Sequence, residues 1–224
     1  MAVETYLEIG KKRVFAGALA WPGWCRSGRD ENAAIEALLA YGERYGEVLR
    51  AAGLSFAPPK RATTFEVVER VNGDATTDFG APSTAPRVDE EDLDRRALAR
   101  QRAILEACWA ALDRTAKGAS GKELRKGPRG GGRELDEIVG HVIGAEASYA
   151  RMIRATPPSV DGPAAIAAKD EVRATALDAL ERAVEHGLPE AGPRGGKRWS
   201  PRYFVRRAAW HVLDHAWEIE DRST

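Results

Sequence analysis

From residue 88 onward, apolar residues recur every three or four positions in four separate stretches. The stretches cover residues 88–116, 133–154, 163–186 and 201–221. This period is that of an α-helix with one apolar face. Four amphipathic helices bury those faces by packing side by side. The sequence therefore predicts a C-terminal four-helix bundle over residues 88–224.

The first 72 residues have a different pattern, with short stretches rich in β-branched and aromatic residues that are typical of strands. These stretches cover residues 3–9, 13–21 and 63–71. Residues 31–52 between them have helical periodicity, with Asp30 placed to cap the start and Gly53 to end the helix. We expect a small βαβ-type N-terminal domain over residues 1–72.

Residues 73–87 combine proline, glycine and small polar residues, a composition typical of a linker. We place a domain boundary there. The expected fold class is therefore α+β with two domains, a small mixed domain followed by a helical bundle.

The charge balance narrows the classes of partner. Lys plus Arg and Asp plus Glu both number 34, so the chain has no net charge to draw it onto nucleic acid. No run of about 18 apolar residues is present, which argues against a membrane partner. The first residues lack an apolar signal segment, and there are only two cysteines. We expect a cytoplasmic protein.

Three histidines are placed to point into the predicted bundle. His211 and His215 are four residues apart on the last helix, on one stripe with apolar residues, and His141 lies on the inner face of the second helix. Buried imidazoles need partners, and one divalent cation satisfies all three. Zinc is our first choice, with nickel or iron as alternatives. The other reading is that each ring makes a single hydrogen bond in the core.

Carboxylates one turn from a histidine can orient its ring and raise its basicity. Glu137, Asp214 and Glu218 have this spacing, and Glu218 lies nearest to the histidine stripe. We expect these three to support the site, Glu218 before the others.

The opposite side of the last helix is also apolar, because it carries Trp210, Leu213 and Trp217. A helix that is apolar on both sides is usually buried on both sides. We expect this second stripe to be an interface with the N-terminal domain or with a second copy in a homodimer.

The segments GHVIGAEASYARMI, around His141, and AAWHVLDHAWEIEDR, around His211 and His215, resemble the DinB-like (YfiT-like) metal-binding four-helix bundles. The resemblance covers residues 88–224. It implies a divalent metal on these three histidines. It also implies a transferase, isomerase or hydrolase that acts through a metal-activated low-molecular-weight thiol or water.

The segment WPGWCRSGRDENAAIEALLAYGERYGEVL resembles HicB-like antitoxin domains, and the similarity spans residues 3–71. It implies a protein partner. The chain could therefore be a non-catalytic metal-binding or partner-binding module, an antitoxin-like interaction protein, instead of an enzyme.

The substrate expected for an enzyme is a small molecule. Basic residues gather in two loops, at residues 122–133 and 194–202, each just before a helix that carries histidine. Loops of this kind favour an anionic substrate if they border the metal cavity. They are otherwise solvated, mobile loops.

Overall fold

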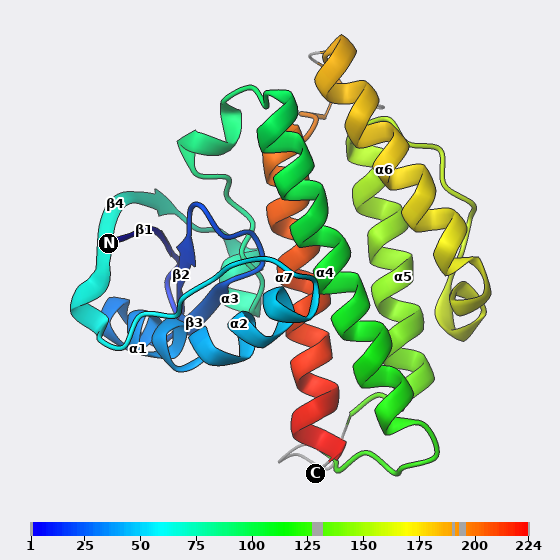
Figure 1. The fold of residues 1–224 in the computed structure, drawn as a ribbon, viewed down its shortest axis with the longest axis horizontal. Helices are drawn as coiled ribbons and strands as arrows, with labels where there is room; N and C mark the ends of the chain where they lie inside the picture. The colour runs from blue at the N-terminus through cyan, green and yellow to red at the C-terminus, as the bar shows by residue number, and fades with distance from the viewer. Residues whose placement is uncertain (1, 127–131, 190, 193–195, 224) are drawn as a thin grey trace.

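The computed structural model describes residues 2–126, 132–189, 191–192 and 196–223. A small sheet with its own helices packs against a C-terminal helical region built mainly of long helices (Figure 1). The α+β class is confirmed.

The sheet has four strands in the order β3-β2-β1-β4 in the described residues. The strands are β1 (Val3–Ile9), β2 (Val14–Ala18), β3 (Cys25–Gly28) and β4 (Phe65–Asn72). β2 is antiparallel to both of its neighbours, and β1 is parallel to β4. The parallel pair needs a crossover, which the helices between β3 and β4 supply. β3 was not predicted, and β2 is shorter than the predicted strand 13–21.

That crossover is two helices, where the periodicity predicts one. α1 (Glu31–Ala40) and α2 (Gly42–Ala51) are separated at Tyr41, whose φ of −91° and ψ of 0° lie outside the helical region. Asp30 accepts a hydrogen bond from the backbone N–H of Ala33 at 2.8 Å, so the predicted cap is confirmed. Gly53 follows the end of α2 with a φ of +73°, as a helix-ending glycine should.

The stretch expected to be a linker contains α3 (Ala75–Phe79) and leads to a 3-10 turn at Arg87–Glu90. It is also attached to β1 through a buried carboxylate. Glu8 is fully buried and accepts hydrogen bonds from the backbone N–H groups of Ser83, at 2.9 and 3.1 Å, and Thr84, at 3.1 Å. The Thr77 hydroxyl donates to the same carboxylate. The segment is thus held against the sheet.

The long helices of the C-terminal region are α4 (Arg95–Ala119), α5 (Leu135–Met152), α6 (Lys169–His186) and α7 (Pro201–Ser223). α4 begins later than predicted, since Asp94 caps it by accepting from the backbone N–H of Ala97 at 2.7 Å. α6 also begins later than predicted, because Gly162–Ala168 forms a 3-10 helix. Helices that begin late leave longer connections before them.

Figure 1 shows α4 and α7 running in one direction and α5 and α6 in the other. Because α5 and α6 are parallel, residues 153–168 must return along α5 before α6 begins. They pack so closely that a Cβ atom at Gly140 would overlap the carbonyl oxygen of Gly162. Gly140 directly precedes His141 in the sequence, so the crossover packs on α5 next to this histidine.

Among the described residues, the larger of two apolar clusters runs through both parts of the chain, from β1 to α7, and the smaller one contains Phe15 and Trp210. α7 lies at the centre of the larger cluster. Trp210 makes an edge contact with Phe15 of β2 at 6.0 Å between ring centroids, and Trp217 packs on Tyr41 at 4.9 Å. Leu213 lies against Gly23. The second apolar stripe of α7 therefore packs against the N-terminal part.

Among the described residues, no helix is both long enough and apolar enough to cross a membrane.

Candidate metal centre

The three histidines meet between α5 and α7. Their ring centroids lie 5.2 Å apart for His141 and His211, 5.0 Å for His141 and His215, and 4.7 Å for His211 and His215. One ring nitrogen from each lies within 4.8 Å of the others. The arrangement follows from local structure, because residues four apart on α7 share a face and α5 packs beside that face.

Burial disfavours the protonated form of two of the rings, those of His141 and His211. His211 is 7% exposed, and burial lowers its pKa well below the ordinary value, helped by the charges of His215 and Arg207. Burial, with a smaller effect of His215, lowers the pKa of His141 to about 4. Neutral imidazole has the free lone pair that a metal ion requires.

Glu218 fixes the orientation of one ring. Its carboxylate lies 2.8 Å from Nδ1 of His215 and also accepts from Arg222 at 2.9 Å. The hydrogen bond to His215 is the main reason that the pKa of Glu218 is lowered. An ionised carboxylate on Nδ1 makes this nitrogen the donor and leaves the Nε2 lone pair for a ligand. Glu218 thus lies where the sequence placed it.

The hydrogen bonding of His211 shows whether the cluster suits a metal. Its Nδ1 atom is buried and has no hydrogen-bond partner among the described residues. Leaving a buried polar atom without a partner costs free energy, so a core of singly bonded histidines does not account for this ring. One ring nitrogen from each histidine lies within 4.8 Å of the others, and this donor set of three nitrogens suits zinc, nickel or iron. The residues present fit a metal.

Comparison with known families finds a match over the helices that carry the histidines. The sequence model of the DinB superfamily matches residues 104–219, more than half of the chain. The chain belongs to the DinB superfamily. The match includes α5 and residues 201–219 of α7, which together carry the three histidines, and it confirms the DinB-like resemblance over that part.

No curated protein and no solved structure matches this DinB superfamily chain. The family match begins after the N-terminal sheet. The HicB-like resemblance of residues 3–71 therefore stays a prediction.

Two carboxylates expected beside the histidines of this DinB superfamily protein have other partners. Asp214 accepts from Arg26 of β3 at 2.8 Å, which ties α7 to the sheet. Glu137 is exposed and accepts from the backbone N–H of Glu134 at 3.0 Å, as part of the capping box of α5. Helical spacing alone could not separate these roles from that of Glu218, because all three carboxylates lie three or four residues from a histidine.

The structure adds two neighbours of the cluster that sequence reasoning missed. The ring of Tyr149 lies 5.6 Å from that of His211, and Trp199 covers Tyr149 at 5.1 Å. Arg207 lies one turn before His211 on α7 and is buried. The sequence gives no signal that separates Arg207 from Arg206, which directly precedes it.

A cavity of about 980 Å³ opens beside these aromatic residues, lined by Trp199 and Tyr203 among others. One aromatic layer, Tyr149, separates Trp199 from His211. The basic loop before α7 contributes Lys197 and Arg198 to the lining. Residues 193–195 of that loop, and residues 127–131 of the loop before α5, lie outside the described residues.

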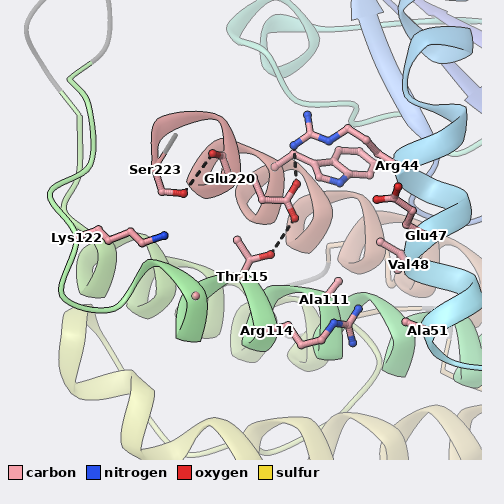
Figure 2. Close-up of a pocket in the computed structure, with 12 residues that line it drawn as sticks. Arg44, Glu47, Val48, Ala51, Ala111, Arg114, Thr115, Lys122, Glu220 and Ser223 are labelled. Carbon is pink, nitrogen blue, oxygen red and sulfur yellow. Dashed lines mark hydrogen bonds and ion pairs between the residues drawn. The ribbon is translucent and has the colours of Figure 1, made fainter.

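A second cavity, of about 430 Å³, lies between α2, α4 and α7 (Figure 2). None of the three histidines lines it. Its Glu220 carboxylate already accepts from Arg44 at 2.6 Å and from Thr115 at 3.0 Å. This cavity has no part in the chemistry available to the histidines.

Proposed function

We propose that the protein binds one divalent metal ion through His141, His211 and His215 and acts on a small molecule as a metal-dependent transferase, isomerase or hydrolase. Zinc is the metal we favour, with nickel or iron as alternatives. The observation that carries the proposal is the meeting of three imidazoles with ring nitrogens within 4.8 Å of one another, together with a buried nitrogen of His211 that has no partner among the described residues. In this proposal α4 to α7 form the DinB-type four-helix bundle.

A divalent ion held there would supply Lewis acidity and would lower the pKa of a bound low-molecular-weight thiol or water. The residues of the chain would hold the ion and orient its ligands. Three protein ligands leave a further position for a ligand, as in catalytic sites and unlike closed structural ones. Glu218 and Arg222 hold the ring of His215 in place.

Water is partly kept from the cluster by side chains. Tyr149 covers His211, and Trp199 covers Tyr149 on the side of the large cavity. A small molecule entering from that cavity would have to displace or pass this aromatic pair. We infer that these two rings border the path of the substrate.

Two cations favour an anionic substrate. Arg133 is exposed just before α5, and its charge helps to lower the pKa of His141 and of His211. Arg207 acts on His211 in the same way. Positive charge near a site attracts anions to it and opposes their escape.

Cobalt(II) gives a direct test, because its visible spectrum reports the ligands around it. The protein is loaded with one equivalent of cobalt(II) and titrated with 2-mercaptoethanol. An open position predicts a new sulfur-to-cobalt absorption band that saturates with added thiol. A cobalt spectrum that thiol leaves unchanged would refute a reaction that acts through a metal-bound thiol.

A further inference from the structure

Arg207 is a buried cation beside the histidine cluster. Its residue is 9% exposed, and its guanidinium carbon lies 4.6 Å from the ring of Trp210 and 5.3 Å from the ring of Tyr149. Its NH1 atom is buried and, within the described part of the chain, has no hydrogen-bond partner. Two aromatic faces surround this guanidinium where a carboxylate would be expected.

Other buried arginines of the same chain show the usual arrangement. Arg206, the preceding residue, is bound by Asp89 at 2.6 Å. Arg173 is bound by Glu146 at 3.2 Å and by Asp113 at 2.9 Å. A cation removed from water without an anion is costly. The described residues offer Arg207 no carboxylate within 4.0 Å.

The position of Arg207 relates it to the cluster. It precedes His211 by four residues, so the two side chains leave the same face of α7 about 6 Å apart along the helix axis. Tyr149 contacts both of them. A ligand that reached the histidines from beside Tyr149 would pass within reach of the guanidinium.

A second buried donor lies close by. The Nε1 atom of Trp210 is also without a partner in the residues that the structure describes. The arginine and the indole therefore bring two unused N–H groups to one short stretch of α7. An acceptor that arrives with a ligand would satisfy such donors.

We propose that Arg207 binds a carboxylate group of the substrate or thiol cofactor whose reactive end lies at the histidine cluster. The placement of the ligand's reactive end at the histidines rests on the proposed function. The carboxylate site at Arg207 does not itself require the metal. One guanidinium walled by aromatic rings balances one negative charge, and its planar fork matches a carboxylate. A phosphate, with more charge, would call for more cations and donors than Arg207 and Trp210 provide.

The test compares two thiols on the cobalt(II)-loaded protein, 3-mercaptopropionate and the uncharged 2-mercaptoethanol, by titration of the sulfur-to-cobalt band. The wild type should bind the carboxylate-bearing thiol about ten- to a hundredfold more tightly. Arg207→Gln should lose this preference and keep both its cobalt content and its affinity for 2-mercaptoethanol. Arg207→Lys should keep part of the preference, and it serves as the second variant if the glutamine variant fails to fold.

Arg182→Gln is the matched control, because it removes one positive charge from an exposed position on α6. It should behave as the wild type. A wild type without the preference, or an Arg207→Gln variant that retains it, would overturn the assignment. Displacement of 3-mercaptopropionate by inorganic phosphate at lower concentration than by acetate would overturn the choice of carboxylate.

Failure of the metal site can be told apart from failure of the anion site. If the wild type takes up no cobalt, the proposed function fails. The metal-free proteins are then titrated with 3-mercaptopropionate, and binding is followed by tryptophan fluorescence. Binding by the wild type and by Arg182→Gln, lost in Arg207→Gln, would still support the anion site. Equal titrations for all three would refute it.

Discussion

Replacing Arg206 by methionine should destabilise the protein by about 3–5 kcal/mol, because a buried carboxylate would lose its partner. Arg206 Nε and NH2 donate to Asp89 at 2.6 and 2.8 Å, and Asp89 is fully buried. The same guanidinium donates to the carbonyl oxygens of Ala18 and Leu19 at 3.0 and 2.9 Å. It therefore joins α7 both to the sheet and to the segment before α4.

The magnitude divides into two parts that a second variant separates. The larger part is the Asp89 carboxylate left charged and unpaired in the core. The smaller part is the loss of a donor to the carbonyls of Ala18 and Leu19, about 1–3 kcal/mol. The double variant Arg206→Met, Asp89→Leu removes the carboxylate as well. It should recover the larger part and be more stable than the single variant by about 2 kcal/mol.

The assay is urea denaturation, followed by tryptophan fluorescence and far-ultraviolet circular dichroism. Arg44→Met is the control at the same junction, because Arg44 pairs with Glu220 at 2.6 Å near the surface, where its side chain is 28% exposed. It should cost no more than about 1 kcal/mol. The reasoning is refuted if Arg206→Met costs as little as this control, or if the double variant is no more stable than the single one.

Three further outcomes follow from the same structure. Glu218→Gln should weaken zinc binding about ten- to a hundredfold in competition with a chromophoric chelator, and unchanged affinity would contradict its orienting role. Gly140→Ala should lower the free energy of unfolding by more than about 1 kcal/mol. Gly144→Ala should instead be neutral or raise it by up to about 1 kcal/mol, and denaturation curves that shift alike would contradict the close crossover. Burial raises the pKa of the Cys25 thiol to about 12 and raises that of Cys108, so neither should react with dithiobis-nitrobenzoate near neutral pH until urea is added. Rapid labelling of the native protein would show that the thiols are accessible.

Sequence periodicity located the histidines because their positions are set by one helix face at a time. His211 and His215 needed only helical spacing, and His141 needed only the inner face of its own helix. The distances between them depend on how α5 packs on α7, which no local pattern encodes. That the rings lie 4.7–5.2 Å apart is therefore a result of the structure.

The missed elements share a physical cause. β3 has the sequence CRSG, which lacks the β-branched and aromatic residues of a typical strand, and it forms because it pairs with β2. The break at Tyr41 occurs inside a stretch with uninterrupted helical periodicity. In both places tertiary contacts override local preference.

Buried charge was equally beyond the reach of the sequence. Glu8, Asp89 and Arg207 occur in stretches where a charged residue is usually solvated. The structure shows that all three are buried. Glu8 and Asp89 have partners from distant segments, whereas Arg207 has a buried nitrogen without one among the described residues. The same property separates Arg206, which has its carboxylate within the chain, from Arg207, which we infer receives one from a ligand.

Elemental analysis of the purified protein, after equilibration with zinc and removal of excess ion, tests the central claim most directly. The wild type and the exposed-site control His186→Ala should each retain one zinc ion per chain, and the variant His211→Ala, His215→Ala should retain none while remaining folded by circular dichroism. Equal zinc in all three proteins, or none in the wild type, would show that these imidazoles do not form a metal site.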